Sequence, residues 1–396
     1  MFQHSSSHPI QKYMNPARLH DIKAFTKGKE TPFLIIDLSR VGTLYDALQR
    51  SLKTAKIYYA VKANPETEVV KLLAQKGSYF DVASRYEIEQ LLKLKISPAR
   101  MSFGNTIKKA KDVQYAFKKG IRHFATDALS DLENLAKYAP GSLVTFRLLL
   151  PEGGSADWPL SRKFGADPEM VYELALEAVK KGLTPYALSF HVGSQQRDIN
   201  EWDKALKTCK TLWDRLKKEG VMLSGINVGG GFPATYLHPV PETKEYGEKI
   251  KSYVTKYFGK EKLDIILEPG RSIAGDAGII FSDVVLVSRK SEKEKVRWVY
   301  LDIGKFGGLI ETLDEAIKYP ILIEGKEKET QVSGVILAGP TCDSADILYE
   351  KFKYQLPNSL KAGDRALIFS TGAYTSSYSS VAFNGFPPLK VYILKK

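Results

Sequence analysis

The sequence contains few of the residues that build disulfide scaffolds and metal centres. Only two of its 396 residues are cysteines, Cys209 and Cys342, which excludes a disulfide framework and a cysteine-rich metal site. It has six histidines and no carboxylate at metal-ligand spacing from them, so we expect no zinc site either. Scarce cysteine is typical of a reducing compartment, and we expect a cytoplasmic protein.

Long apolar runs are also missing. No stretch approaches the roughly 18 consecutive apolar residues of a membrane-spanning helix, so we expect no membrane partner. The segment Met1–His8 has neither a basic nor an apolar stretch, and we expect no cleaved signal peptide.

What is present is an ordinary globular composition with an excess of positive charge. Hydrophobic residues make up 43% and charged residues 26%, and the length predicts two or three domains. The net charge of +13 would suit nucleic-acid binding. Its lysines, however, come in pairs such as Lys108-Lys109 that alternate with acidic residues along predicted helices. We assign them to a solvated surface and expect no nucleic-acid partner.

Short β-rich runs alternate with amphipathic segments between about residue 55 and residue 270. Eight strands, each followed by a helix, predict a (βα)8 barrel over residues 38–275 rather than an open doubly wound sheet. The expected strands are Lys56–Val61, Tyr79–Val82, Arg100–Phe103, Arg122–Ala125, Leu143–Leu149, Tyr186–Phe190, Leu223–Val228 and Asp264–Leu267. The expected helices are Glu66–Gln75, Arg85–Leu94, Lys108–Lys118, Leu129–Tyr138, Pro168–Lys181, Asn200–Lys218 and Thr243–Phe258.

After about residue 275 the β-rich segments are separated by glycine, proline and charged turns. This pattern predicts a mainly antiparallel β domain, made of residues 1–37 and 276–396, with one helix near Ala345–Phe352. We expect the apolar strand Pro32–Asp37 to join this sheet. The other expected strands are Gly278–Val287, Val296–Leu301, Val332–Ala338, Arg365–Phe369 and Leu389–Leu394.

Polar residues lie at or just after the carboxyl end of every predicted barrel strand, which is where barrel enzymes carry their chemistry. They are Lys62, Ser84, Asn105, Asp127, Arg147, His191–Ser194, Gly229–Gly231 and Glu268–Arg271. The glycine triplet exposes backbone N–H groups, and Gly270-Arg271 adds a guanidinium one strand later. Together they predict a phosphate site.

Single residues of this rim leave alternatives open. Lys62 ends an apolar strand, where it forms a Schiff base or extends its amine to water. Glu268 pairs with Arg271 or with a cationic ring nitrogen of a cofactor, and His191 could be a core histidine. In the β domain, Cys342 beside Asp343 is either a small buried residue or a reactive thiol.

Taken together, these motifs resemble the ornithine decarboxylases of the pyridoxal-phosphate-dependent family that shares the alanine racemase fold. The resemblance runs from about residue 32 to residue 390. It implies a barrel plus a β domain, pyridoxal 5′-phosphate as cofactor, and a head-to-tail homodimer with shared active sites. The matching stretches are Ala60–Asn64, Phe80–Ser84, His191–Ser194, Gly229–Pro233, Glu268–Arg271, Cys342-Asp343 and Gly372–Tyr374.

The resemblance also implies roles for single residues. Lys62 binds the cofactor covalently, His191 stacks on its ring, and Glu268 pairs with the ring nitrogen. Cys342, from the partner subunit, protonates the substrate carbon. The implied phosphate ligands are Ser194, Gly229, Gly230, Gly231, Gly270, Arg271 and Tyr374; the implied supporting residues are Asp81, Glu87 and Arg147; and the implied substrate-binding residues are Asp314, Asp343 and Phe383.

The substrate is predicted from smaller differences. Diaminopimelate decarboxylases usually carry Cys-Glu-Ser where this chain has Cys342-Asp343-Ser344, and Asp343 with Asp314 suits a distal ammonium group. We therefore expect decarboxylation of L-ornithine to putrescine in polyamine biosynthesis. Lysine is longer by one methylene, worth only about 1–3 kcal/mol, so a lysine/ornithine decarboxylase that also makes cadaverine stays open. A non-catalytic regulatory paralogue and an amino-acid racemase are the alternatives of other kinds.

Overall fold

The computed structural model describes residues 12–150, 155–158, 163–259 and 261–395. The chain divides into two compact units. The first, called the β unit below, comprises the described residues up to Val41, Ala234–Pro239 and the residues from Ile273 onward. The second, called the barrel unit, comprises Gly42–Pro233 and Val240–Ser272.

Eight parallel strands of the barrel unit close into a barrel in the order β10-β11-β2-β3-β4-β5-β6-β8. All eight expected strands are present, and the closure confirms the barrel over the open sheet. The strands are β2 (Ala55–Ala60), β3 (Tyr79–Val82), β4 (Met101–Phe103), β5 (His123–Thr126), β6 (Leu143–Arg147), β8 (Thr184–Ser189), β10 (Gly225–Asn227) and β11 (Asp264–Leu267).

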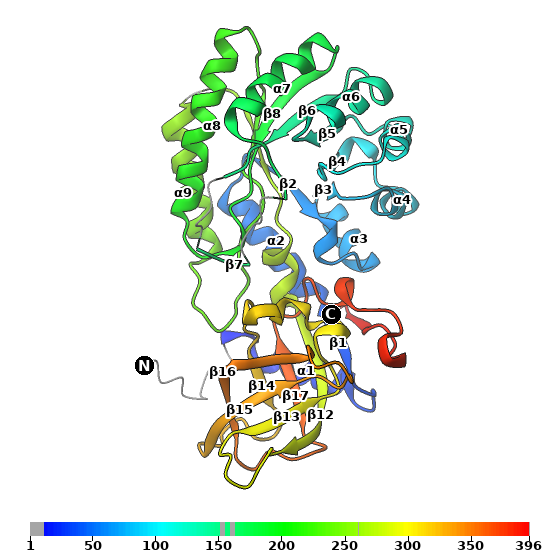
Figure 1. The fold of residues 1–396 in the computed structure, drawn as a ribbon, viewed down its shortest axis with the longest axis vertical. Helices are drawn as coiled ribbons and strands as arrows, with labels where there is room; N and C mark the ends of the chain where they lie inside the picture. Colours follow the sequence, from blue (N-terminus) through cyan, green and yellow to red (C-terminus); the bar gives the residue numbers. More distant parts are fainter. Residues whose placement is uncertain (1–11, 151–154, 159–162, 260, 396) are drawn as a thin grey trace. The chain divides into compact units, whose positions relative to one another are not determined.

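Amphipathic helices surround these strands (Figure 1). The nineteen-residue helix α8, for example, buries Trp202, Leu206 and Leu212, while its lysines lie on other sides. The helices are α3 (Thr67–Gln75), α4 (Arg85–Lys93), α5 (Ala110–Lys118), α6 (Leu129–Tyr138), α7 (Pro168–Lys180), α8 (Asn200–Lys218) and α9 (Thr243–Phe258). A small antiparallel pair, β7 (Ala156–Trp158) and β9 (Ser194–Gln196), adds to the loops.

Two helices that flank the barrel strands differ from the expected pattern. Helix α2 (Leu38–Ser51) precedes the first barrel strand and was not expected; Gly42 lies in its interior, and an interior glycine disfavours a helix. The last barrel strand is followed only by the four-residue helix α10 (Arg271–Ala274).

The β unit contains an eight-stranded, mainly antiparallel sheet. Strand β1 pairs antiparallel with β12 and parallel with β18, which confirms that the Pro32–Asp37 segment joins this sheet. The ring of Phe33 stacks on Phe281 at 5.1 Å in its core. The strands are β1 (Phe33–Asp37), β12 (Gly278–Ser288), β13 (Arg297–Leu301), β14 (Ile321–Ile323), β15 (Val332–Ala338), β16 (Ile347–Pro357), β17 (Arg365–Phe369) and β18 (Lys390–Leu394).

The helix expected near Ala345–Phe352 is wrong, because β16 runs through this segment. The side chains of Tyr349 and Tyr354 are buried, and strands favour aromatic residues that pack against cross-strand neighbours. Helix α1 (Pro16–Thr26), capped by Asn15, packs Leu19 and Ile22 into the core of the same unit. None of the helices in the described ranges is long and apolar enough to cross a membrane.

Candidate active site

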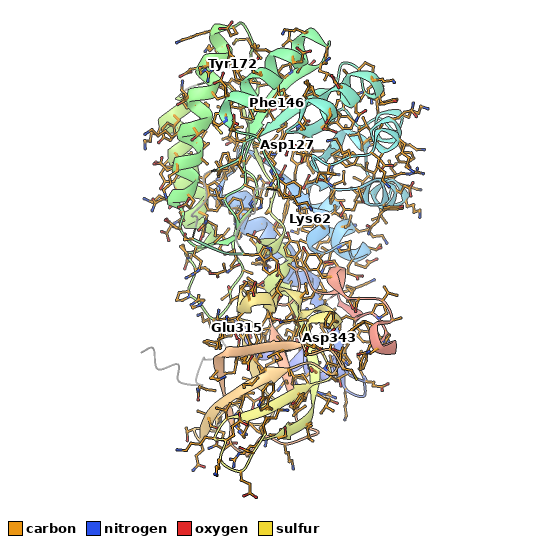
Figure 2. The ribbon with its side chains drawn as sticks, viewed as in Figure 1. Lys62, Asp127, Phe146, Tyr172, Glu315 and Asp343 are labelled. Atoms are coloured by element: carbon orange, nitrogen blue, oxygen red, sulfur yellow. The ribbon has the colours of Figure 1, made fainter. Side chains whose placement is uncertain are left out.

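Lys62 lies on the short 3-10 turn Val61–Ala63 that follows β2 (Figure 2). Its Nζ is 3.8 Å from Oδ2 of Asp81, at the end of the neighbouring strand β3. The Lys62 side chain is 53% exposed and that of Asp81 only 6%. Burial raises the pKa of Asp81, and the positive charges of Lys62 and Arg147 oppose this rise. The amine can therefore be reached from outside while its counter-ion stays fixed and buried.

Glu268 follows β11 and is held by a neighbour from β10. Asn227 Nδ2 donates a hydrogen bond to Glu268 Oε1, and Asn227 Oδ1 accepts one from Gly229 N at 2.9 Å. Desolvation and the nearby Asp81 charge raise the pKa of Glu268 to about 7. A carboxylate in this state is stabilised by a cation placed beside it.

The glycine triplet approaches its surroundings too closely for any side chain. A Cβ at Gly230 would lie 2.7 Å from the Glu268 carbonyl oxygen and 3.1 Å from His191 Nε2. Gly229 and Gly231 have φ angles of 68° and 97°, in the left-handed region that favours glycine. The residue types of this turn are thus dictated by its backbone.

Arg271 and Ser194 form a hydrogen-bonded pair in the barrel unit. Arg271, which follows the buried Gly270, is 3% exposed, and its Nε and Nη2 donate to Ser194 Oγ, each at 3.1 Å. A buried guanidinium beside a hydroxyl and a glycine turn is a donor set suited to a phosphate. Of the phosphate residues expected from the sequence, only Tyr374 belongs to the β unit.

His191 is held in one tautomer at the same end of the barrel. Gly193 N donates to His191 Nδ1 at 3.0 Å, which leaves Nε2 to carry the proton of the neutral ring. Desolvation, with the positive charges of Arg147 and Lys62, lowers the pKa of His191 to about 3. The imidazole is therefore neutral at physiological pH.

Two further expected residues support this cluster. Arg147 ends β6 with its guanidinium carbon 4.8 Å from the centre of the Phe164 ring, and desolvation lowers its pKa. Glu87 Oε2 accepts from Ala83 N at 2.6 Å, and Ser84 Oγ caps α4 by accepting from Glu87 N. Desolvation raises the pKa of Glu87 to about 7.

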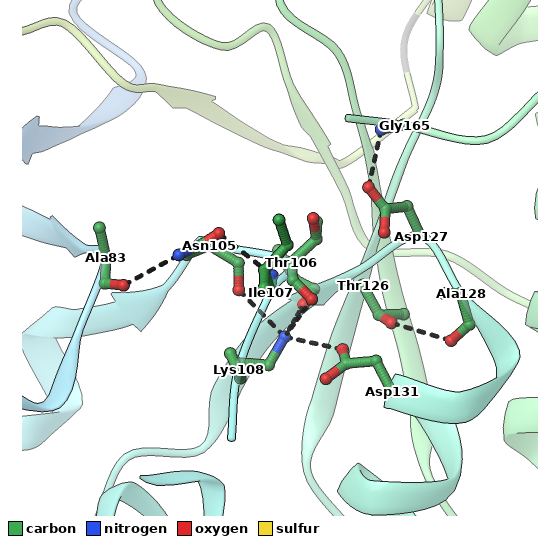
Figure 3. A network of polar contacts seen from close by, with 11 residues as sticks. Ala83, Asn105, Thr106, Ile107, Lys108, Thr126, Asp127, Ala128, Asp131 and Gly165 are labelled. Atoms are coloured by element: carbon green, nitrogen blue, oxygen red, sulfur yellow. Dashed lines mark hydrogen bonds and ion pairs between the residues drawn. The ribbon is translucent and has the colours of Figure 1, made fainter. Parts of the chain in front are cut away.

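Polar residues of the rim also hold the loops after β4 and β5 (Figure 3). Asn105 Nδ2 donates to the Ala83 carbonyl at 3.1 Å, and Asp127 Oδ2 accepts from Gly165 N at 2.7 Å. Together with the helix cap Ser84, these side chains bind backbone groups. The polar rim therefore contains loop-forming residues as well as the cluster around Lys62.

The paired lysines were expected on the solvated surface, and for Lys108 this expectation is wrong. Its side chain is 0% exposed, and its Nζ donates to Asp131 Oδ2 and to the Ala125 carbonyl, both at 2.7 Å (Figure 3). Burial lowers the pKa of Lys108, and the charge of Asp131 opposes this effect. The assignment was wrong because Lys108 precedes α5, which begins at Ala110, so the helix period does not describe it.

Asn227 and Gly104 were not among the expected site residues. A Cβ at Gly104 would lie 1.9 Å from Asp81 Oδ1, so this glycine makes room for the carboxylate opposite Lys62. Both residues stand at or directly after the end of a barrel strand, which is the signal that could have found them.

The expected residues of the β unit lie outside its strands, with Asp314, Cys342 and Asp343 exposed and Phe383 and Tyr374 partly buried. Cys342 and Asp343 follow β15; Cys342 N donates to Asn384 Oδ1 at 2.9 Å, which joins this loop to the turn that contains Phe383. The Phe383 ring packs 4.6 Å from that of Phe306. Asp314 and Tyr374 also belong to this unit, and both have positive φ angles, 52° and 56°. Within the described ranges, no group of three or more His, Cys, Asp or Glu could hold a metal ion.

Comparisons with known proteins agree with these observations. Residues 38–275 match the family described as pyridoxal-dependent decarboxylase, pyridoxal binding domain. The lysine/ornithine decarboxylase of Selenomonas ruminantium is 33% identical over 374 residues, 92% of this chain and 90% of the relative. Antizyme inhibitor 2 of Xenopus laevis is 30% identical over 371 residues, 91% and 80% of the two chains. The solved lysine/ornithine decarboxylase of Vibrio vulnificus, complexed with cadaverine, has a TM-score of 0.86 at 28% identity and covers 97% of this chain and 100% of that one.

The barrel unit has the groups that a pyridoxal phosphate requires. Its glycine turn leaves no space for a Cβ, and Arg271 with Ser194 supplies hydrogen-bond donors for a phosphate. The raised pKa of Glu268 indicates a carboxylate that a cationic ring nitrogen would stabilise. The cofactor also requires an accessible amine for its attachment, and Lys62 has an exposed amine opposite the buried carboxylate of Asp81.

Proposed function

The chain belongs to the pyridoxal-dependent decarboxylases, and from this we propose that it converts L-ornithine to putrescine and CO2, a step of polyamine biosynthesis. Pyridoxal phosphate is the cofactor of this family. The observation that carries the proposal is the grouping of Lys62, Asp81 and Glu268 at one end of the barrel.

When bound, pyridoxal phosphate supplies a ring that accepts electrons as the carboxylate leaves. We assign Lys62 to its covalent attachment, with Asp81 orienting the amine at 3.8 Å. We assign Glu268 to keep the ring nitrogen protonated and the neutral His191 to pack on the ring face. The assigned phosphate ligands are Ser194, Gly229, Gly230, Gly231, Gly270, Arg271 and Tyr374, and Arg147 and Glu87 support the site.

The β unit is proposed to complete this site in a head-to-tail homodimer, with the β unit of one copy facing the barrel of the other. The exposed thiol of Cys342 then delivers a proton to the carbon that lost its carboxylate. Asp343 and Asp314 bind the distal ammonium group, and Phe383 packs against the methylenes of the substrate.

The proposal of ornithine rests on Asp343, which follows Cys342 and suits a distal ammonium group rather than a second carboxylate; its Oδ1 accepts from Ala345 N at 2.8 Å. The names of the Selenomonas and Vibrio relatives support lysine as a second substrate. The test is kcat/KM for both amino acids with pyridoxal phosphate present. A preference for ornithine beyond about 200-fold exceeds what one methylene supplies and supports the single substrate, similar values support the bifunctional enzyme, and no CO2 from either overturns the proposal.

A non-catalytic regulatory protein is the second candidate, and the likeness to antizyme inhibitor 2 favours it. Purified protein mixed with pyridoxal phosphate distinguishes the two. An enzyme develops the visible absorbance of a covalently held cofactor and loses it in Lys62→Ala, whereas a protein that binds no cofactor shows no band in either form. We also propose a cytoplasmic location, supported by two free cysteines, one buried and one exposed.

A further inference from the structure

Asp314 and Glu315 form an uncommon turn in the β unit. Their φ angles are 52° and 56°, so two successive residues with side chains adopt the left-handed conformation. Residues other than glycine seldom visit this region, and then usually singly. The turn ends the short helix η6 (Ile310–Glu315), and another contact has to hold it in place.

The carboxylate of Glu315 provides that contact. Oε1 accepts from the backbone N–H groups of Glu350 and Lys351 at 2.7 and 2.6 Å, and Oε2 accepts from Phe352 N at 2.8 Å. These three residues are consecutive in β16, and Glu315 is labelled in Figure 2. Desolvation raises the pKa of Glu315, but the three hydrogen bonds outweigh it and hold the pKa below its usual value.

The chain after the turn is fixed to the same strand. Tyr349 OH donates to the Ile317 carbonyl at 2.8 Å and accepts from Tyr319 N at 3.0 Å. Asp314 itself is exposed, and its neighbour Leu313 is 46% exposed. The turn therefore presents Asp314 on the surface of the unit. Glu315 holds it to Glu350–Phe352, where the pairing of β16 with β15 is irregular, and Tyr349 holds the residues that follow.

We propose that Glu315 is a positioning residue for substrate: its carboxylate locks the turn onto β16 and so fixes the direction of the Asp314 carboxylate. The inference rests on the proposed function, in which Asp314 binds the distal ammonium group. That group is remote from the bond that breaks, so losing its orientation weakens binding more than it slows the chemical step.

The test is a double-mutant cycle of Glu315→Ala and Asp314→Ala, with ornithine and lysine as substrates. We expect Glu315→Ala to raise KM about tenfold, as for loss of one hydrogen bond to a charged group, with kcat within about twofold. Because Glu315 acts through Asp314, adding Glu315→Ala to the Asp314→Ala protein changes KM little further. Glu315→Gln keeps the shape and one acceptor oxygen, so it gives an intermediate KM and serves if Glu315→Ala does not fold.

The matched control is Glu329→Ala. Glu329 also holds backbone of the β unit, accepting from Ser359 N at 3.2 Å and Ser359 Oγ at 2.6 Å, but it lies between β14 and β15. We expect a lowered Tm and an unchanged KM. The inference is overturned if the Glu315 variants have the same KM as this control. It is also overturned if the effects of Glu315→Ala and Asp314→Ala on KM add fully in the double variant. Both results leave the proposed function standing. Asp314→Ala with unchanged KM removes Asp314 from the proposed site and overturns the inference with it, and a native protein that decarboxylates neither amino acid overturns both.

Discussion

The two units hold their candidate residues in different ways. In the barrel unit the functional side chains contact one another: Lys62 faces Asp81, and Arg271 binds Ser194. In the β unit Cys342 and Asp343 are exposed, and their loop is tied through a backbone N–H to Asn384. The barrel unit thus contains a cluster of interacting charges, whereas the β unit presents single groups on anchored turns. This difference is compatible with the proposed site, whose cofactor part lies mostly in the barrel unit and whose substrate part comes from another chain.

The largest effect on activity is expected from substitutions that inactivate one of these two parts at a time. Lys62→Ala removes the residue assigned to the cofactor and abolishes decarboxylation. Cys342→Ala removes the assigned proton donor and slows product formation about 10²–10⁴-fold. If each site combines the two units of different chains, mixing the two inactive variants restores about a quarter of native activity, because half of the dimers then carry one intact site.

Activity of the mixture, measured after the subunits have exchanged, checks this expectation. The control is each variant mixed with itself, which stays inactive. Mixed variants that remain as inactive as the separate ones contradict the shared site and place both parts in one chain.

The fold was largely predictable from the sequence because buried strands and half-buried helices require apolar residues at regular spacing. All eight barrel strands follow from apolar runs between amphipathic helices. The errors lie where that pattern is weak. Helix α2 contains Gly42, and the Ala345–Phe352 segment mixes lysine and glutamate with aromatic residues that fit either a helix or a strand.

The sequence predicted that polar residues gather at the carboxyl ends of the barrel strands, but it did not predict the role of each one. Asn105 and Lys62 both follow a barrel strand, yet Asn105 binds the Ala83 carbonyl while Lys62 faces Asp81. The direction of a side chain depends on loop conformation, and sequence spacing does not encode it beyond regular elements. For the same reason the burial of Lys108 and the close fit of Gly104 to Asp81 appear only in three dimensions, although the place of Gly104 after β4 could have marked it as a candidate.

Lys108 tests how far the barrel unit depends on buried charge. Lys108→Met leaves the Asp131 carboxylate buried without its cation, and we expect a loss of about 3–5 kcal/mol in the free energy of unfolding. Replacing both, as Lys108→Met with Asp131→Leu, is expected to cost much less, since no charge is then left unpaired. Urea denaturation measures both values.

The control in the β unit is Lys23→Met, which breaks partly exposed ion pairs with Glu324 and Glu327. Such pairs contribute about 0–1 kcal/mol. Equal losses for Lys23→Met and Lys108→Met would contradict the contrast between the units.

Gly104→Ala tests the close fit around Asp81. The added Cβ would lie 1.9 Å from Asp81 Oδ1, so the carboxylate has to move, and we expect destabilisation of about 1–3 kcal/mol with weaker cofactor binding. Gly42→Ala, within a helix, is the matched control: its Cβ would meet the flexible end of Lys76 at 2.9 Å and make ordinary contact with Leu72 at 3.8 Å, and we expect no loss of stability. Thermal unfolding and titration with pyridoxal phosphate measure the two effects, and a Gly104→Ala protein that binds the cofactor like the native one would falsify the role of this glycine.

The smallest change in stability is expected from pH, measured without cofactor. It compares the two units directly, because a carboxylate of each unit changes its pKa on folding in the opposite direction. The pKa of Glu268 rises from 4.5 to about 7 on folding, so its stabilisation is present below pH 4.5 and is lost as pH rises to about 7. The pKa of Glu315 is lowered instead, so its stabilisation is present above 4.5 and is lost as pH falls through its folded pKa. Comparing the Tm of Glu268→Gln and Glu315→Gln with that of native protein should give differences of opposite slope, between pH 4.5 and about 7 for Glu268 and below pH 4.5 for Glu315. Adding pyridoxal phosphate places a cation beside Glu268 in the proposed site, so it should flatten the first slope and leave the second unchanged; a Glu268 slope that persists with cofactor bound would separate this carboxylate from the ring nitrogen.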